Sequence, residues 1–230
     1  GTNGKTTTCS LIHSILQKRD TLGLMPTGGG KSIAFQVPAL VLEGVCIVVT
    51  PLIALMKDQV SHLRKKNIRA AAIYSGLSHE EVIRHLDNAV LGAYDLLYLS
   101  PERLETDLFQ TKLRHMKVSF ITIDEAHCIS QWGYDFRPSY LNISHIRTLL
   151  PEVPVLALTA TATPKVVKDI CWQLSHIGRE DRPIENLPTN NFNKDTDGRK
   201  EEIIEGFHIY RMSFARPNLN YILRQADDKV

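Results

Sequence analysis

Residues 25–32 are Met25-Pro26-Thr27-Gly28-Gly29-Gly30-Lys31-Ser32, a glycine-rich segment that follows an apolar run and precedes a helix-like one. The glycines allow backbone amides to curl around phosphate oxygens, and a helix N-terminus adds partial positive charge. Lys31 would reach the β- and γ-phosphates, and the Ser32 hydroxyl would ligate Mg²⁺. Met25 replaces the first glycine of the general G-x-x-x-x-G-K-[ST] pattern, and the alternative is a glycine-rich turn without a ligand. The strand–loop–helix context favours a nucleotide-binding loop.

Short, mostly continuous apolar runs alternate with longer amphipathic segments, as expected for strands of a parallel sheet covered on both faces. The Ser78/Glu81 pair has the pattern of a capping box, and Thr163-Pro164 that of a helix start. We predict strands at 21–25, 45–50, 70–74, 95–100, 118–123, 155–158 and 208–214, and helices at 53–66, 79–90, 102–116, 139–150 and 164–176. This alternation predicts an α/β fold with a doubly wound, mainly parallel sheet, which binds ligands at the C-terminal ends of its strands.

The composition is that of one globular domain. The chain has 230 residues, 43% of them hydrophobic, which is enough for one sizeable core. A net charge of +2 neither requires nor excludes nucleic acid. The four cysteines form no C-x-x-C, which favours reduced thiols over a disulfide framework or a zinc site. No membrane-length apolar run or export signal occurs, so we expect a cytoplasmic protein without membrane contact.

Residues 178–206 interrupt the strand–helix alternation. The segment is polar, contains two prolines and has few large apolar side chains. Such a composition is typical of a mobile surface insertion.

A second candidate site is the acidic pair Asp124-Glu125, which follows the apolar run at 118–123. Successive side chains of a strand point in opposite directions, so Asp124 can hold Mg²⁺ while Glu125 faces the attacking water. An isolated Asp-Glu pair is usually a solvated strand end. Together with an upstream phosphate loop, the pair predicts a Walker B site, with Glu125, Lys31 and Asp124 as catalytic residues.

The sequence DEAH at 124–127 continues as Cys128-Ile129-Ser130-Gln131-Trp132-Gly133-Tyr134-Asp135-Phe136-Arg137-Pro138-Ser139-Tyr140. This string resembles the aromatic-rich loop of RecQ DNA helicases. Segments 25–32, 49–59, 99–104 and 157–163 resemble motifs I, Ia, Ib and III of the same family, and 214–219 resembles the exit from its first motor domain. The resemblance implies a RecA-like P-loop NTPase domain over 11–220 that uses ATP and Mg²⁺.

By this resemblance, five residues would contact DNA. Trp132, Phe136 and Arg137 would sense single-stranded DNA, while Ser100 and Arg103 would touch its backbone. Aromatic side chains stack on bases of any sequence, and an arginine adds phosphate or π contacts. The alternatives are core packing for the aromatic residues and a plain surface position for Ser100 and Arg103.

The resemblance also implies residues that couple nucleotide state to movement. His127 would bridge the ATP site to the threonine-rich motif that contains Thr161 and Thr163. Thr163 can equally be a helix cap. A zinc site formed by His127 and Cys128 is disfavoured, because two adjacent residues do not comfortably bind one metal ion.

The first ten residues depart from the RecQ pattern. The family opens with an aromatic-Arg-x-x-Gln stretch whose glutamine recognises adenine, but the corresponding positions hold Gly4, Lys5 and Thr8. Instead, GTNGKTT at 1–7 resembles the phosphate loop of Mur-type amino-acid ligases. No strand precedes it to anchor such a loop, so we interpret 1–10 as an atypical and artefactual segment, with a helix from residue 8 to 18.

The leading hypothesis is therefore the first motor domain of a RecQ-like 3′-to-5′ DNA helicase, acting on single-stranded and forked DNA in the bacterial cytoplasm, associated with the nucleoid. Residues 221–230 would begin the linker to an absent second RecA-like domain, whose arginine finger is worth about 10³–10⁵ in rate in other phosphoryl-transfer enzymes. The isolated chain should then be weak or inactive. The alternatives are a non-catalytic nucleotide- and DNA-binding fragment and, on GTNGKTT alone, a Mur-type ligase.

Overall fold

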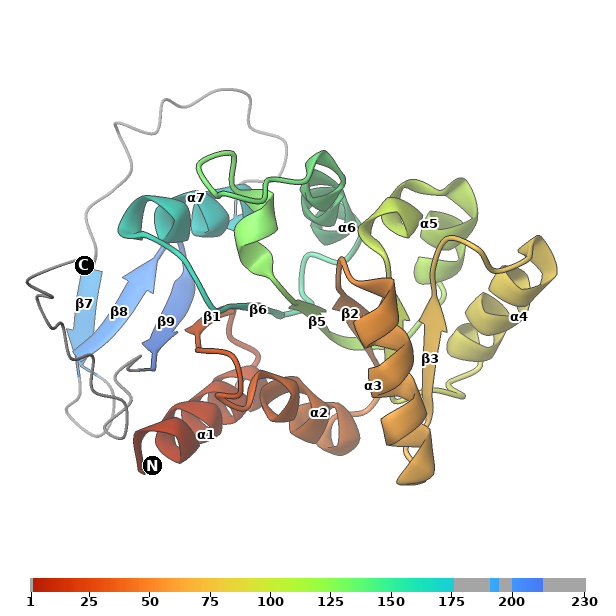
Figure 1. The fold of residues 1–230 in the computed structure, drawn as a ribbon, viewed down its shortest axis with the longest axis horizontal. Helices are drawn as coiled ribbons and strands as arrows, with labels where there is room; N and C mark the ends of the chain where they lie inside the picture. Colours follow the sequence, from red (N-terminus) through yellow and green to blue (C-terminus); the bar gives the residue numbers. More distant parts are fainter. Residues whose placement is uncertain (1, 176–190, 195–199, 213–230) are drawn as a thin grey trace, which may run out of the picture.

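A computed structural model describes residues 2–175, 191–194 and 200–212, and within them a single nine-stranded sheet (Figure 1). The strand order is β3-β4-β2-β5-β6-β1-β9-β8-β7, and every pairing from β3 to β9 is parallel. Strands β8 and β7 add an antiparallel edge. The bounds are β1 Thr21–Leu24, β2 Val45–Val49, β3 Ala70–Ile73, β4 Leu96–Leu99, β5 Val118–Ile123, β6 Val155–Thr159, β7 Asn191–Lys194, β8 Lys200–Ile204 and β9 Phe207–Arg211.

Helices cover both faces of this sheet. One face carries α1 Thr2–Leu16, α2 Lys31–Val41 and α3 Ile53–Lys65, and the other carries α4 His79–Val90, α5 Asp107–Leu113, α6 Asn142–Leu149 and α7 Pro164–Ser175 (Figure 1). Three 3₁₀ helices, η1 Pro101–Glu105, η2 Ala126–Ile129 and η3 Pro138–Leu141, lie in the connections. The predicted doubly wound α/β fold is confirmed. None of the described helices is both long and apolar enough to span a bilayer.

The alternation of buried side chains along the strands explains the two helical layers. In β2, Cys46 and Val48 pack in the core beneath α1 to α3, whereas Ile47 and Val49 pack in the core beneath α4 to α7. Successive strand residues point to opposite faces, so a strand that is apolar at every position must be covered on both sides.

Two predicted helices are divided in the structure. The helix expected over 102–116 breaks at Thr106, whose hydroxyl accepts a hydrogen bond from the Phe109 amide at 3.4 Å and begins α5. The helix expected over 139–150 begins as η3 and continues as α6. In both cases a proline, Pro101 or Pro138, starts a short 3₁₀ turn before the α-helix.

The expectation of a mobile insertion over 178–206 is wrong for 191–194 and 200–204, which form β7 and β8. Polar residues can pair through their backbone at a sheet edge, and β8 pairs with β9 in this way. The Ile204 side chain of β8 is buried in the core beside Phe207. Residues 178–190 and 195–199 of this segment lie outside the described residues, as do 214–219 and 221–230.

The N-terminal stretch GTNGKTT is helical over residues 2–7, because α1 begins at Thr2. A helix does not wrap its amides around a phosphate, so the resemblance to a Mur-type phosphate loop is not realised in the structure. The helix extends further toward the N-terminus than the predicted 8–18. Leu11 and Ile15 anchor it in the core under the sheet.

Asp20 ties the start of β1 to β6 and α6. Its Oδ1 accepts from the Val155 amide at 2.8 Å, and its Oδ2 accepts from Arg147 Nη2 at 2.7 Å. Arg147 is buried, and its Nε and Nη1 have no other hydrogen-bond partner within the described part of the chain. The Asp20 carboxylate is therefore the main compensation for a buried positive charge.

Asp20→Ala should lower the free energy of unfolding by about 3 kcal/mol, because losing one partner leaves Arg147 buried and uncompensated. Urea unfolding measures this. The matched control is Glu43→Ala, which removes the carboxylate of the exposed Glu43–Lys117 pair and should cost less than about 1 kcal/mol. Equal losses in the two variants would contradict the role given to Asp20.

Candidate functional site

The glycine-rich loop joins the end of β1 to the start of α2. Gly28 and Gly30 have φ angles of 77° and 92°, in the left-handed region that favours glycine. A Cβ on Gly29 would lie 2.8 Å from the Pro26 carbonyl oxygen, too close for any side chain. Each of the three glycines thus meets a backbone requirement. The loop brings Lys31 to the first position of α2, where the free amides of a helix N-terminus favour an anion.

The acidic pair does not follow the geometry predicted for it. Strand β5 ends at Ile123, and Glu125 adopts φ 51° and ψ 46°, a left-handed conformation that is uncommon for residues other than glycine. The side chains of Asp124 and Glu125 are therefore separated by a backbone turn rather than by strand alternation. Hydrogen bonds from Glu125 N to Asp124 Oδ1 and from Cys128 N to Glu125 O hold this turn.

The structure brings the loop and the acidic pair together although they are 94 residues apart in sequence. Lys31 Nζ lies 3.4 Å from Glu125 Oε1, with both side chains largely shielded from solvent. Ser32 Oγ accepts a hydrogen bond from Gln59 Nε2 at 3.5 Å, and Gln59 Oε1 accepts one from the hydroxyl of Tyr98 at 2.9 Å. Gln59, in the segment resembling motif Ia, thus orients Ser32.

The oxygen groups at this site suit a hard divalent cation. Burial raises the pKa of Asp124, and the neighbouring charge of Glu125 raises it further, while Lys31 opposes both effects. Two adjacent carboxylates near a single ammonium group leave negative charge that a cation would neutralise. Carboxylate and hydroxyl oxygens are ligands of such cations, so Asp124 and Ser32 fit the Mg²⁺ that the sequence resemblance implies.

A second group of possible metal ligands is formed by His127, Cys128 and Asp135, whose ligand atoms lie within 4.8 Å of one another. The sequence pattern gives no indication of Asp135 as a ligand. Its carboxylate is already paired with Arg137 at 3.0 Å, and burial raises the pKa of the Cys128 thiol to about 12. A cysteine binds zinc as the thiolate, which burial disfavours here, and the Asp135 carboxylate is occupied by Arg137, so these side chains do not fit zinc.

His127 connects the acidic pair to the threonine-rich strand end and to the aromatic-rich loop. Its Nδ1 lies 2.9 Å from Thr159 Oγ1 and 3.4 Å from Glu125 Oε2. The ring of Tyr134 stacks on the imidazole at 5.0 Å, with the planes 17° apart. Burial is the largest cause of the lowered pKa of His127, which favours the neutral ring near pH 7.

The two threonines predicted to couple nucleotide state to movement differ in position. The Thr161 hydroxyl donates to the Tyr134 hydroxyl at 3.4 Å, and the Thr161 amide donates to Thr159 Oγ1 at 3.4 Å, so Thr161 adjoins the His127 contacts. Thr163 instead caps α7 by accepting from the Val166 amide at 3.4 Å. Sequence reasoning missed Thr159 and Tyr134, although both lie inside the quoted motifs.

The aromatic-rich loop exposes the side chain most suited to stacking. Trp132 is 53% exposed, and Lys165 Nζ lies 3.1 Å from the centroid of its ring. Phe136 is half-buried, and Arg137 is paired with Asp135. The Trp132 side chain is therefore accessible to solvent, whereas the Arg137 side chain forms a partly exposed ion pair with Asp135.

A buried carboxylate fixes the start of this loop. Ser130 Oγ donates to Asp169 Oδ2 of α7 at 2.5 Å, and the Trp132 amide donates to Ser130 Oγ at 3.2 Å. Asp169 is 2% exposed, and burial raises its pKa more than the Ser130 and Gln173 hydrogen bonds lower it. Sequence reasoning missed this connection, because Asp169 lies 39 residues from Ser130 in the chain.

Ser100 and Arg103, the two residues expected to touch the DNA backbone, differ in their surroundings. Ser100 is 3% exposed, and its hydroxyl has no hydrogen-bond partner among the described residues, so it is not at the surface as the prediction required. Arg103 Nη2 donates to the Tyr74 carbonyl at 2.9 Å. Ser100 directly follows the buried strand β4, and this position explains why its side chain is buried.

Asp169→Asn should change how stability depends on pH. A pKa raised by folding stabilises the folded state fully below the unfolded pKa, about 3.9, and that contribution is lost as pH rises through the folded value. The asparagine does not titrate. As pH falls toward the unfolded value, the free energy of unfolding of the original chain should rise relative to that of the variant. A pH-independent difference in urea unfolding would contradict the buried carboxylate.

Comparison with known proteins places the chain in a class. A family model described as DEAD/DEAH box helicase matches residues 7–170. The chain belongs to the DEAD/DEAH box helicase family. Its α/β fold is like that of the Pyrococcus furiosus Hef helicase domain, with a TM-score of 0.56 at 19% identity, covering 82% of this chain and 40% of that one. The expected RecA-like fold is confirmed.

Within this family, the chain is similar in sequence to RecQ DNA helicases. It is 53% identical over 164 residues to the ATP-dependent DNA helicase RecQ of Bacillus subtilis (strain 168), covering 71% of this chain and 28% of that protein. It is 38% identical over 213 residues to the ATP-dependent DNA helicase RecQ of Pasteurella multocida (strain Pm70), covering 93% and 29%. The predicted resemblance is confirmed, over less than a third of each relative's length.

Proposed function

We propose that this chain binds ATP-Mg²⁺ and single-stranded DNA and couples ATP hydrolysis to 3′-to-5′ unwinding as the first motor domain of its intact protein. One observation carries the proposal. Glu125 lies 3.4 Å from Lys31 of the phosphate loop on one side and 3.4 Å from His127 on the other. His127 in turn contacts Thr159 and Tyr134, so a continuous set of contacts joins the nucleotide site to the aromatic-rich loop.

The contacts of Lys31 suggest how nucleotide binding prepares the site. In the structure, the Lys31 ammonium pairs with Glu125. The β- and γ-phosphates of ATP offer more negative charge than one carboxylate, so Lys31 would turn toward them and release Glu125. The freed carboxylate would orient the attacking water and accept its proton. Asp124 and the Ser32 hydroxyl would hold Mg²⁺, which supplies neutralisation of the phosphate charge.

The same contacts suggest how DNA acts on the ATP site. A base stacking on the ring face of Trp132 that Lys165 covers would displace Lys165 and move the loop that carries Tyr134. Because Tyr134 stacks on His127, this movement would change the hydrogen bonds of His127 to Thr159 and Glu125. Arg137 would exchange Asp135 for a DNA phosphate.

The remaining expectations belong to the same proposal. A second RecA-like domain of the intact protein would complete the nucleotide site, so this chain alone should hydrolyse ATP slowly. Its partners would be single-stranded and forked DNA, and its location the bacterial cytoplasm at the nucleoid. The non-catalytic alternative is favoured by Gly4, Lys5 and Thr8, which stand where the family's adenine-recognising residues are expected.

Lys31→Ala and Glu125→Gln separate the catalytic proposal from the non-catalytic one. Lys31→Ala should weaken ATP binding, whereas Glu125→Gln should preserve binding and reduce turnover by roughly 10²-fold or more, because the amide cannot accept a proton. Steady-state ATPase assays, with and without a single-stranded oligonucleotide, and ATP-binding titrations measure these effects.

The ATPase and binding measurements together separate a motor domain from a non-catalytic fragment. Turnover that is stimulated by DNA and lost in both variants supports a motor domain. ATP and DNA binding without turnover in the unmodified chain would instead identify a non-catalytic fragment.

Trp132→Ala should weaken the affinity for single-stranded DNA by roughly 10-fold, since base–aromatic stacking is worth about 1–3 kcal/mol per base. Trp132→Phe should retain part of this affinity because a smaller ring still stacks. Leu91→Ala, at a residue 81% exposed in another part of the surface, is the control. Fluorescence anisotropy with a labelled oligonucleotide measures the affinities, and an unchanged value in Trp132→Ala would exclude stacking on this ring.

A further inference from the structure

Three polar residues follow neighbouring parallel strands at the carboxyl edge of the sheet. Thr50 follows β2, Ser100 follows β4 and Asp124 follows β5, and the last residues of these strands pair in register. The Thr50 amide donates to the Leu99 carbonyl at 3.1 Å, and the Asp124 amide donates to the Val49 carbonyl at 2.9 Å, so the ladder continues through them. Neighbouring strands lie about 4.8 Å apart, so the three residues form a row across the sheet.

The side chains of this row point toward the helical layer of α1 to α3. The residues two or four positions earlier on the same strands pack in the core beneath that layer, namely Val48, Tyr98 and Phe120. Tyr98 also donates to Gln59 of α3 at 2.9 Å. Alternate residues of a strand share a face, so Thr50, Ser100 and Asp124 share the face that these helices cover.

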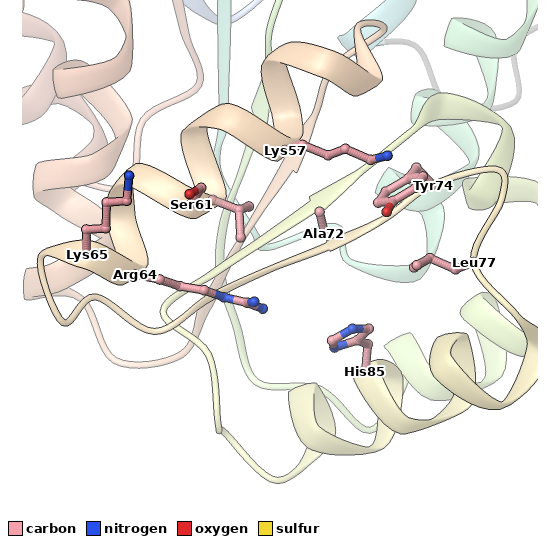
Figure 2. A pocket seen from close by; sticks show the side chains of 9 residues that line it. Lys57, Ser61, Arg64, Lys65, Ala72, Tyr74, Leu77 and His85 are labelled. Atoms are coloured by element: carbon pink, nitrogen blue, oxygen red, sulfur yellow. The ribbon is translucent and has the colours of Figure 1, made fainter.

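The row ends at a basic pocket on the side away from Asp124. Tyr74 follows β3, and Ile73 pairs in register with Leu99, so Tyr74 lies beside Ser100. Figure 2 shows Tyr74 in the lining of this pocket, which has a volume of about 540 Å³ and lies between α3, β3 and α4. Its cations come from α3 and are Lys57, Arg64 and Lys65. The Thr50 and Ser100 hydroxyls therefore lie in the core between this pocket and the acidic pair.

Both hydroxyls in the row are buried without a hydrogen bond to the protein. Thr50 and Ser100 are 2% and 3% exposed, and neither hydroxyl has a hydrogen-bond partner among the described residues. A buried hydroxyl that makes no hydrogen bond lowers stability, so native folds supply such groups with a partner, often an ordered water. Two such hydroxyls on neighbouring strands point to one shared partner.

The Asp124 carboxylate offers the acceptor that completes this arrangement. Its Oδ1 accepts from the Glu125 amide at 3.1 Å, and its Oδ2 accepts no direct hydrogen bond within the described part of the chain. Burial and the charge of Glu125 raise the pKa of this carboxyl, whereas Lys31 and the Thr50 hydroxyl lower it. Thr50 thus acts on the carboxylate without a direct hydrogen bond to it. A buried water commonly makes about three hydrogen bonds to polar groups that lack other partners.

We propose that Thr50 and Ser100 share one buried water, which donates a hydrogen bond to Asp124 and holds that carboxylate toward the divalent cation. The inference rests on the proposed function, in which Asp124 and Ser32 bind Mg²⁺. Two oxygens bridged by one water lie up to about 5.5 Å apart, which the spacing of neighbouring strands allows. Thr50 and Ser100 are then positioning residues, because they act on the cation through Asp124.

The test is Mn²⁺ binding to the full 230-residue chain, with and without ADP, followed by electron paramagnetic resonance of the free ion. Mn²⁺ takes the same oxygen ligands as Mg²⁺. Thr50→Val removes the hydroxyl from a side chain of similar shape and should weaken Mn²⁺ binding about 10-fold, as is typical when a metal ligand loses its outer hydrogen bond. Thr50→Ser keeps the hydroxyl and should restore most of the affinity.

Thr122→Val is the matched control. Thr122 is buried on β5, two residues before Asp124, and its hydroxyl lies 3.5 Å from Cys46 Sγ. The variant removes the same group from the same core, but outside the row, and should leave Mn²⁺ affinity unchanged. An equal loss of affinity in Thr122→Val and Thr50→Val would assign the effect to core packing and overturn the proposal.

A second measurement does not depend on the cation. In urea unfolding with EDTA, Thr50→Val should lower the midpoint, because the hydrogen bonds of the shared water are lost. If the hydroxyl were unsatisfied instead, its removal would raise the midpoint and overturn the proposal. Should Thr50→Val fail to fold, Ser100→Ala tests the other hydroxyl. It should weaken Mn²⁺ binding several-fold, and an unchanged affinity would again overturn the proposal.

The binding data also separate this proposal from the proposed function. If the unmodified chain binds Mn²⁺ neither with nor without ADP, the cation site itself is wrong and both proposals fail. If the unmodified chain and Thr50→Val bind Mn²⁺ equally well, only the shared water fails.

Discussion

The parallel hydrogen bonding of β2, β5, β6 and β1 is the constraint on which the site depends. Ile123 pairs in register with both Val49 and Ala157, and Leu24 pairs with Thr159. These pairings end the strands at one edge of the sheet, so the segments that follow them converge there. Without this register, Lys31 could not approach Glu125, and His127 could not reach Thr159.

The convergence concentrates charge and backbone strain in one place. Asp124 is buried beside a second carboxylate, and Glu125 has a left-handed backbone. Such features lower stability and persist where surrounding contacts over-determine them. Here the contacts are the Lys31–Glu125 pair, the turn closed by Cys128, and the flanking core strands. The arrangement is consistent with a site organised for phosphate chemistry rather than for stability.

The molecule also divides its charged surfaces along the sheet. The phosphate loop and the acidic pair lie in the middle of the carboxyl edge of the sheet, next to the aromatic-rich loop. Asp169 of α7 holds one part of this loop through Ser130, and Tyr134 in the loop stacks on His127. The basic pocket lies at the far strand β3, supported by α3 and α4. Gln59, near the middle of α3, orients Ser32, and the same helix also lines the pocket, so α3 contacts both places.

The sequence by itself determined the features set by short-range patterns. The glycines and Lys31 of the loop, the position of Asp124-Glu125, the strand–helix alternation and the capping box at Ser78 all depend on residues adjacent in the chain. Tertiary structure decided which distant groups meet. The contacts of Thr159 and Tyr134 with His127, of Asp169 with Ser130, and of α3 with β3 and α4 at the pocket depend on strand register and helix packing. The burial of Ser100 and the pairing of 200–204 with β9 were likewise decided there, because local composition does not specify which neighbour will cover a segment.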